Sequence, residues 1–529
     1  SWICQPLKDL KKILKRQEVV KQLVANSNER YEIERQLKNI YDIQRLSTRL
    51  SNGTANPRDF LSIKTSLQAL PDLVSVAKTI GLSVFNLIED ELGSLNDYAD
   101  LIERTISEDA PNTIKEGGLI KQGVSSDLDY LRDLMCNGEN WLKEFEQREK
   151  DRTGINILKV GYNRVFGYFI EVTNSNLSKV PPDYIRKQTL SGAERFITDE
   201  LKKHEDEVLT AQVKAFELEY KMFSDFRNYS KEFVTLIRQT AECISELDVF
   251  TSFAEIAVEQ NYVCPELDES GDFFIKNGRH PVLEKILPLG TYVANDIELS
   301  SSDKSKTEFM ILTGPNMAGK STYMRQNALI AILAQIGSFI PADCGKIGII
   351  DKIFTRVGAS DDLTLGKSTF MVEMTETAYI LNSATDKSLI LIDEIGRGTS
   401  TYDGVAIAWS VAEYIAGKIG ARCIFATHYH ELNVMTNSYP QIKNYRITVS
   451  EENGEIEFLR KIVQGGASKS YGIQVAKMAG LPNSVVKRSE ELMSRMQRDF
   501  SKNLSKGKSR AKTEAEIDVQ APQLNLFGE

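Results

Sequence analysis

The chain has 529 residues, which is too long for a single hydrophobic core and predicts several domains. Hydrophobic residues make up 41% and charged residues 26%, an ordinary globular balance. The sequence has no run of 18 or more apolar residues, so no membrane span is expected. Because the formal net charge is −9, a nucleic-acid-binding function would need a basic surface confined to one part of the molecule.

The beginning of the chain and its cysteines indicate where the protein works. It starts at Ser1 without a methionine and has no signal-peptide pattern, so we interpret it as a piece of a longer protein. Its six cysteines lie far apart without a CxxC pair, a pattern typical of reduced, buried thiols. We therefore expect a cytoplasmic location.

The first region, 5–110, is predicted to be mostly helical. One apolar stripe recurs every three or four residues and consists of Ile33, Leu37, Ile40, Ile43, Leu46 and Leu50. Glycines interrupt the pattern at 117–123, and a short helix carrying Trp141 and Phe145 is expected next.

A β-rich insert is predicted within a helical stem. Over 155–173, apolar and polar residues alternate as in strands, with turns expected near 162–163 and 166–167. No proline occurs from 183 to 264, and a 4-3-4-3 spacing predicts a seam for packing against another helix, formed by Leu209, Val213, Phe216, Tyr220 and Phe223. The stem is expected to leave at about 140 and return at about 205.

A third region starts near 265 and alternates apolar runs with helical stretches. The runs "EFMILTG", "KSLILIDE" and "ARCIFATH" show no polar alternation, which is typical of strands buried on both faces of a parallel α/β sheet. The polar tail 501–522 is expected to be disordered, and an apolar cluster follows it near the end of the chain.

A phosphate-binding loop is predicted between the strand "FMILT" and a helix that begins near Ser321. The spacing Gly314-x4-Gly319-Lys320-Ser321 matches the loop pattern in full and lies in the strand–helix context that the pattern requires. Lys320 would bridge the β- and γ-phosphates, and the Ser321 hydroxyl would ligate Mg²⁺. The backbone of the loop would surround the phosphates, so the nucleotide-binding residues expected here are Gly314, Pro315, Asn316, Met317, Ala318, Gly319, Lys320, Ser321 and Thr322.

Three further residues are candidates for ATP hydrolysis. Asp393 ends the apolar strand "LILID" and could hold Mg²⁺, and Glu394 follows it as a candidate general base. His428 ends the strand "IFAT", where ligand sites of α/β sheets gather, and could orient water or contact the γ-phosphate. The alternatives are a surface carboxylate at a strand end and a core histidine.

A helix is predicted to start after Ser368 in "GKSTFMVEMTETAYIL". Ser368 is a good N-cap, and acidic residues at 373 and 376 suit the early turns of a helix. A second interpretation is that this helix start binds the γ-phosphate of a nucleotide held by another subunit. The residues alone do not decide between the two.

Several of these segments together resemble the MutS family of DNA mismatch-repair ATPases, and most closely its bacterial mismatch-repair members. The resemblance rests on "TGPNMAGKSTYMRQ", "TRVGASDDLTLGKSTFMVEMTETA", "LIDEIGRGTSTYDGVAIAW" and "FATHYHEL". It extends to "WICQPLKD", "TGINILKVGYNRVFGYFIEVT" and "GGASKSYGIQVAKMAGLP", and so covers nearly the whole chain.

The resemblance implies a multidomain α and α/β fold. It consists of helical core and lever segments at 1–139 and 206–265, a β-rich clamp domain inserted at 140–205, an ABC-like P-loop ATPase domain at 266–480, a helical dimerisation segment at 481–500 and a tail at 501–529. The family's mismatch-reading and connector domains would precede Ser1. We therefore expect that this chain does not recognise a mispair by itself.

The resemblance also implies ATP, ADP and Mg²⁺ as ligands in composite sites of a dimer. Ser368 would contact the partner's nucleotide, and Asn316 would lie by the γ-phosphate. Tyr292 matches the aromatic residue that stacks on adenine. An aromatic residue or histidine can flank the other face of the base in the family, and here the aligned position is Arg460, a departure from that pattern. MutL is an implied protein partner.

Two segments are predicted to bind macromolecules. Residues 148–203 hold eleven Lys and Arg against seven Asp and Glu, a local net charge of +4 that suits phosphate contacts to double-stranded DNA. The candidate DNA-binding residues are Lys159, Arg164, Lys187, Arg195 and Lys202. The chain ends in "QLNLFGE", which resembles the peptide by which bacterial repair proteins dock on the replicative sliding clamp, through Gln523, Leu524, Leu526 and Phe527.

The predicted function is an ATP-dependent DNA sliding clamp of mismatch repair, associated with the bacterial nucleoid. A chromosome-maintenance ATPase is disfavoured because Lys320 and Asp393 are only 73 positions apart, and a transporter ATPase because no "LSGGQ"-like signature appears. A MutS paralogue acting on branched or recombination DNA is the remaining alternative.

Overall fold

The computed structural model describes residues 2–114, 117–163, 167–288, 290–303, 305–315, 318–357, 369–452, 455–466 and 471–495. They form two compact units, one of residues 22–252 and one of residues 1–21 together with the chain from 253 onward. The expected mixture of helical and α/β parts is confirmed. Among the helices in the described part of the chain, none is both long enough and apolar enough to cross a membrane.

The unit 22–252 combines helices with one small sheet. Its helices are α2 (Ser27–Leu37), α3 (Ile43–Ser51), α4 (Pro57–Gln68), α5 (Leu70–Thr79), α6 (Leu92–Thr105), α7 (Ser126–Thr153) and α8 (Asp199–Tyr229), while α1 (Leu10–Ala25) and α9 (Val234–Glu259) contain residues of both units. Its strands are β1 (Lys159–Asn163), β2 (Gly167–Thr173), β3 (Ile185–Thr189) and β4 (Ala193–Ile197). They form an antiparallel sheet in the order β1-β2-β4-β3.

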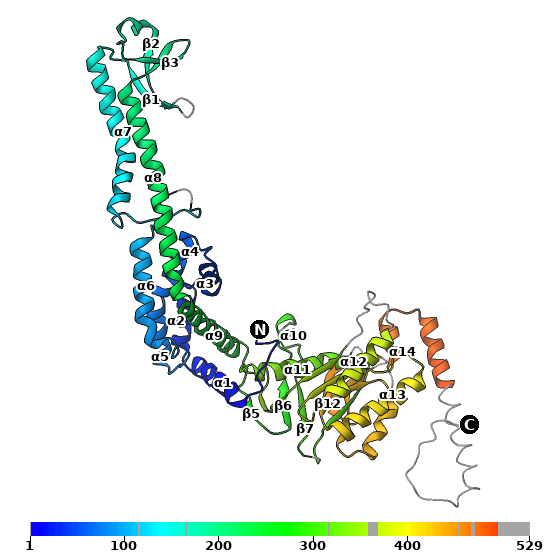
Figure 1. Ribbon diagram of the computed structural model, residues 1–529. Helices are drawn as coiled ribbons and strands as arrows, with labels where there is room; N and C mark the ends of the chain where they lie inside the picture. The colour runs from blue at the N-terminus through cyan, green and yellow to red at the C-terminus, as the bar shows by residue number, and fades with distance from the viewer. Residues whose placement is uncertain are drawn as a thin grey trace, which may run out of the picture. The chain divides into compact units, whose positions relative to one another are not determined.

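The β-sheet lies at one end of a two-helix stem formed by α7 and α8 (Figure 1). The predicted short helix around Trp141 is instead part of the 28-residue α7, so the stem begins well before residue 140. Gly138 does not interrupt α7, because contacts with α8 support the helix on both sides of it. The Trp141 ring stacks on His204 at 3.7 Å between centroids, and the Arg132 Nη2 lies 2.6 Å from the Glu219 Oε1.

The predicted helix-packing seam on α8 is wrong for four of its five members. Leu209, Val213, Phe216 and Tyr220 are exposed, and only Phe223 is buried. The buried residues of α8 are Leu201, Ala211, Ala215, Glu219, Phe223 and Phe226. Small side chains on this other face allow close approach between helices, which the apolar spacing alone did not reveal.

The second unit contains two sheets. Its elements are β5 (Glu266–Asp268), β6 (Asp272–Gly278), α10 (Leu283–Ile286), β7 (Asn295–Ser300), β8 (Phe309–Thr313), α11 (Lys320–Gln335), β9 (Cys344–Gly348), β10 (Ile353–Arg356), α12 (Thr369–Ser383), β11 (Leu389–Asp393), α13 (Thr401–Tyr414), β12 (Arg422–Thr427), β13 (Ile442–Glu452), β14 (Glu455–Gln464) and α14 (Gly472–Met478). The chain is helical again over 483–495. The smaller sheet has the order β5-β9-β6-β7.

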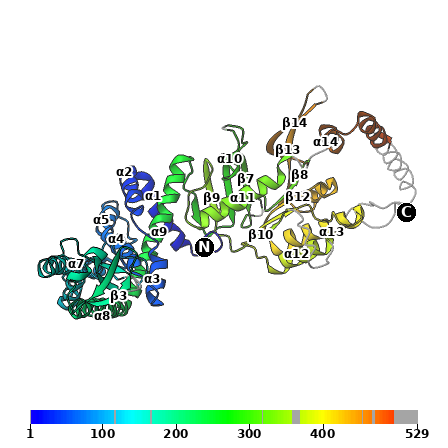
Figure 2. The ribbon, with the colours of Figure 1, turned by 90° about the horizontal axis from the view of Figure 1, so that it is seen from above.

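The larger sheet has the order β10-β11-β12-β8-β13-β14 and is parallel except for its last strand. Both faces of β8, β11 and β12 are buried, as their unbroken apolar runs predict. One face packs on α11 and the smaller sheet, and the other packs on α12 and α13. Figure 2 shows α12 and α13 together on the same side of this sheet.

The cysteines differ in part from expectation. Cys243 and Cys423 are buried free thiols, but Cys4 and Cys344 are exposed. The prediction of uniformly buried thiols is therefore wrong for these two.

Candidate nucleotide site

The turn between β8 and α11 has the geometry of a phosphate-binding loop. β8 ends at Thr313 and α11 begins at Lys320, as the motif predicts. Gly314 (φ 145°) and Gly319 (φ 105°) adopt backbone conformations that favour glycine. The first turn of α11 therefore follows directly after the sharp loop, with its unpaired N–H groups available for an anion.

Lys320 lies in the interior of the site, with only 2% of its side chain exposed. Its Nζ donates to the Gly314 carbonyl oxygen at 2.6 Å and to Glu394 Oε1 at 3.2 Å. Burial lowers the pKa of Lys320, while the Glu394 carboxylate opposes that shift by stabilising the ammonium form. A phosphate oxygen placed beside the loop would meet a poorly hydrated ammonium group.

Ser321 and Asp393 come together from the two phosphate-binding elements. The Ser321 hydroxyl donates a hydrogen bond to Asp393 Oδ2. Burial raises the pKa of Asp393, and this hydrogen bond opposes the shift. A hydroxyl and a carboxylate in contact offer two oxygen ligands of the kind that Mg²⁺ prefers, so the donor set fits the predicted metal.

Glu394 is held in an uncommon conformation beside two cations. Its φ of 57° lies in the left-handed region, and its N–H donates to the Ala426 carbonyl oxygen of β12 at 2.9 Å. The side chain is 7% exposed and pairs with Arg397 as well as with Lys320. A residue forced into this conformation at the end of a strand is a common feature of functional sites.

His428 follows β12 at the same edge of the sheet. Partial withdrawal from water lowers its pKa, the Glu394 carboxylate opposes that shift, and the cations Arg397 and Lys320 add to it. The imidazole is therefore neutral at neutral pH and can accept a proton. Its ring lies 4.1 Å from that of Tyr429, between centroids.

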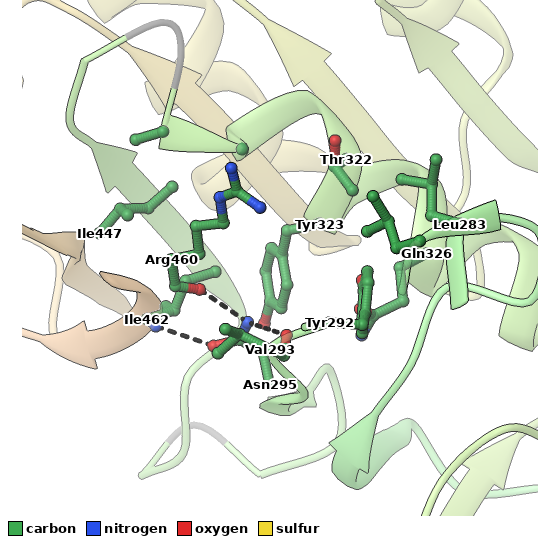
Figure 3. A pocket seen from close by; sticks show the side chains of 13 residues that line it. Leu283, Tyr292, Val293, Asn295, Thr322, Tyr323, Gln326, Ile447, Arg460 and Ile462 are labelled. Atoms are coloured by element: carbon green, nitrogen blue, oxygen red, sulfur yellow. Dashed lines mark hydrogen bonds between the residues drawn. The ribbon is translucent and has the colours of Figure 1, made fainter. Parts of the chain in front are cut away.

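Tyr292 lines a pocket of about 280 Å³ beside the loop. Its hydroxyl donates to Gln326 Oε1 at 2.7 Å, and burial raises its pKa to about 12. Figure 3 shows Arg460 across the pocket from Tyr292, with Tyr323 between them in this view. The pocket offers an aromatic ring and a guanidinium group to a flat ligand next to the phosphate loop.

Asn295 fixes the floor of this pocket (Figure 3). Its Nδ2 donates to the carbonyl oxygens of Val293 at 3.1 Å and Arg460 at 3.0 Å, and its Oδ1 accepts from the Ile462 N–H at 2.8 Å. β14 is thereby joined to the segment that carries Tyr292. Arg460 itself has a φ of 56°, the left-handed region again.

Some predicted residues lie outside the described part of the chain. Asn316, Met317, Ser368 and Arg164 are among them, as is the predicted sliding-clamp peptide at 523–527. Pro315, Ala318, Gly319 and Thr322 belong to the described loop and first helical turn, and the last three line the pocket. These roles stay predictions.

The predicted DNA-binding residues that the structure describes lie on several elements of the β-sheet region. Lys159 lies on β1 and Lys187 on β3, which are opposite edges of the four-stranded sheet, and Lys202 lies in the first turn of α8. These three side chains are exposed. Arg195 on β4 is different, because its Nε pairs with Glu171 Oε2 at 2.9 Å and its guanidinium lies 4.0 Å from the centroid of the Phe169 ring.

Sequence reasoning missed Arg397 and Gln326 as parts of the site. Arg397 follows Glu394 by only three residues in "DEIGRGTS". This short separation could have predicted the ion pair between them. Gln326 lies in the second turn of α11, on the helix that the loop opens, and only the folded structure shows that it reaches Tyr292.

Comparisons with known proteins identify the family of the chain. Residues 1–254 match the family model of MutS domain III, and residues 310–497 match that of MutS domain V. Proteins named DNA mismatch repair protein MutS are similar over nearly the whole chain. The one from Caldicellulosiruptor bescii is 50% identical over 94% of this chain and 58% of its own length.

Relatives from other organisms give the same result. The MutS proteins of Methanosarcina barkeri and Clostridium botulinum are 47% and 46% identical over 97% and 95% of this chain, and over 58% and 54% of their own lengths. The chain thus spans somewhat more than half of the curated relatives that it matches. From these matches, together with the loop, strand and carboxylate geometry described above, we conclude that the chain belongs to the MutS family of DNA mismatch-repair proteins.

Proposed function

We propose that the site at the end of the larger sheet binds and hydrolyses ATP. The observation that carries this proposal is the direct pairing of Lys320 and Ser321, at the start of α11, with Glu394 and Asp393, at the end of β11. Lys320 and the loop N–H groups would hold the phosphates, and Tyr292 would stack on the base. Ser321 and Asp393 would hold Mg²⁺, which when bound neutralises charge on the β- and γ-phosphates.

Glu394 and His428 would act on the attacking water. Glu394 is the candidate general base, since its carboxylate lies beside the Lys320 ammonium that would contact the γ-phosphate. A neutral His428 at the same edge could accept a hydrogen bond from that water and orient it. Arg397 would fix the position of Glu394 through their ion pair.

We further propose that ATP controls the grip of the chain on double-stranded DNA during mismatch repair. Similarity of 46–50% identity to proteins named DNA mismatch repair protein MutS supports this role over that of a paralogue acting on branched DNA. In the proposed cycle, ATP joins two copies, the helical stems carry the β-sheets around the duplex, and hydrolysis opens the assembly. The 483–495 helix suits contact with a second copy because it exposes Val485 and Leu492. MutL and the replicative sliding clamp are proposed further partners.

The test separates nucleotide binding from hydrolysis. Lys320→Ala should abolish ATP-dependent retention on end-blocked duplex DNA, because the phosphates lose their main cation. Glu394→Gln should retain ATP binding but slow hydrolysis by about 10²-fold or more, so that its DNA-bound state lasts longer. Retention of the Lys320→Ala protein at the wild-type level would show that ATP does not control the clamp.

A further inference from the structure

The loop that follows the candidate general base is held by a helix from elsewhere in the chain. Gly396 lies two residues after Glu394, and its N–H donates to Glu373 Oε1 at 2.5 Å. Glu373 lies in the second turn of α12, and its side chain is only 5% exposed. A buried carboxylate from α12 therefore fixes the backbone next to Glu394.

A second contact joins the same helix to the same loop. A Cβ atom added to Gly398 would lie 2.6 Å from the Cβ of Phe370, in the first turn of α12. The loop and the helix are therefore in close contact without an intervening side chain at Gly398. Any displacement of the start of α12 must displace the loop as well.

The other side of the loop is packed just as closely. A Cβ atom added to Gly396 would lie 2.6 Å from the Cα of Gly404, and the Tyr429 hydroxyl donates to the Gly396 carbonyl oxygen at 3.1 Å. Tyr429 is the neighbour of His428. The loop is thus held between α12 and the segment that carries the second candidate catalytic residue.

Arg356 of β10 completes the connection. Its Nη2 lies 3.9 Å from Glu373 Oε2, and its Nε lies 3.0 Å from Glu376 Oε2. Arg356 and Glu373 are both buried, whereas Glu376 is half-exposed. The buried guanidinium compensates the charge of Glu373 and keeps its carboxylate in place below the loop.

From this geometry we infer that Glu373 is a positioning residue that couples α12 to Glu394. The inference rests on the proposed function, in which ATP joins two copies, and on the sequence prediction that the start of α12 contacts the nucleotide held by a second copy of the chain. When that contact forms, α12 and the loop move as one body through Glu373 and Phe370, and Glu394 is placed for hydrolysis.

The experiment uses the whole chain with four variants. Glu373→Leu removes the acceptor for Gly396, Glu373→Gln keeps an acceptor oxygen, and Glu373→Asp withdraws the carboxylate by one methylene group. Glu376→Gln is the matched control, because Glu376 also pairs with Arg356 but is half-exposed instead of being buried below the loop. Steady-state ATP hydrolysis gives kcat and KM, and thermal unfolding with and without ADP reports folding and nucleotide binding.

We expect Glu373→Leu to lower kcat by about tenfold or more with KM changed less than about twofold, since misplacement of a catalytic group by a fraction of an ångström acts on the chemical step. Glu373→Gln should recover most of the rate, and Glu376→Gln should match the wild type. If Glu373→Leu does not fold, Glu373→Asp carries the same expectation. A folded Leu or Asp variant with the wild-type kcat overturns the inference.

A second readout isolates the coupling between copies. Wild-type chains mixed with an excess of Lys320→Ala chains should hydrolyse less ATP per active site, because their α12 then faces a site without nucleotide. The same excess of Lys320→Ala chains should not lower the ATP hydrolysis rate of folded Glu373→Leu or Glu373→Asp chains any further. If it lowers their rate by the same factor as that of the wild type, Glu373 does not carry the signal. If the wild type alone hydrolyses no ATP, the proposed function fails instead, so the two failures are distinct.

Discussion

The candidate site concentrates charge at the point where three parallel strands end. Lys320 and Glu394 are buried, Asp393 is partly buried, and the half-exposed Arg397 pairs with Glu394. A buried ammonium group is stable only when it is paired, and Glu394 supplies the pair here. A phosphate oxygen that accepted from Lys320 would compete with Glu394 for it. Nucleotide binding and the freedom of the general base are therefore linked through one lysine.

His428 makes this site sensitive to pH in a definite direction. Because its pKa lies below its ordinary value of 6.5, the ring is neutral at pH 7 and gains a proton only under more acidic conditions. The hydrolysis rate of the wild type should therefore fall as the pH drops below about 6.5. His428→Asn should be slower at neutral pH by about 10²-fold and should lack the part of this fall that His428 causes.

His430→Asn is the control for this measurement, since it changes a neighbouring histidine on the following turn. Its pH–rate profile should match that of the wild type. A His428→Asn protein with the wild-type rate and profile would exclude the proposed role of His428.

The residues of the site could be predicted from the sequence to different extents. Ser321 and Asp393 were predictable partners, because strands in a parallel sheet present their carboxyl ends at one edge. The pairing of Glu373 with Gly396 was not, because no local pattern reports which backbone N–H a helical carboxylate will reach across 23 residues. An acidic residue in the early turns of a helix interacts favourably with the helix dipole whichever way its side chain points, so its presence does not predict a particular partner.

At the scale of elements, burial on both faces was easier to predict than the choice of a packing face. The apolar runs of β8, β11 and β12 leave no polar side for solvent, so only a covered sheet suits them. Helix α8 carries two candidate faces, one with large side chains and one with alanines. The structure buries the alanine face, which lies in line with His204 and Glu219, two α8 residues that contact α7.

A pair of substitutions tests this assignment of the α8 faces. Val213 is 56% exposed and Ala215 is 3% exposed, although they lie only two residues apart. Val213→Ala should change the free energy of unfolding by no more than about 0.5 kcal/mol. Ala215→Leu should cost about 1–3 kcal/mol, because the added methyl groups have no space against the neighbouring side chains.

Urea unfolding followed by circular dichroism measures both changes, with the transition of the helical unit compared between the variants. If Val213→Ala were the more destabilising of the two, the predicted seam would be the true packing face. The same outcome would require a different contact surface between α7 and α8 from the one described.

At the scale of the whole molecule, a chain of net charge −9 can hold DNA only where cations are both concentrated and exposed. The β-sheet at the end of the stem meets the first condition, with a net charge of +4 over 148–203. The cations of this region differ in the second condition, which is exposure to solvent. Lys159, Lys187 and Lys202 are exposed to solvent, whereas Arg195 is one-fifth exposed and pairs with Glu171.

The salt dependence of DNA binding tests this division. Removal of one phosphate-binding cation should reduce the slope of log K against log salt concentration by about 0.9. We expect Lys159→Ala, Lys187→Ala and Lys202→Ala each to reduce the slope by about this amount on duplex DNA of any sequence, measured by fluorescence anisotropy with ATP. Arg195→Ala should leave the slope unchanged while lowering the thermal stability, because its ion pair and its contact with Phe169 are internal to the sheet. A slope that falls for Arg195→Ala but not for the lysine variants would place the duplex on a different face of the sheet.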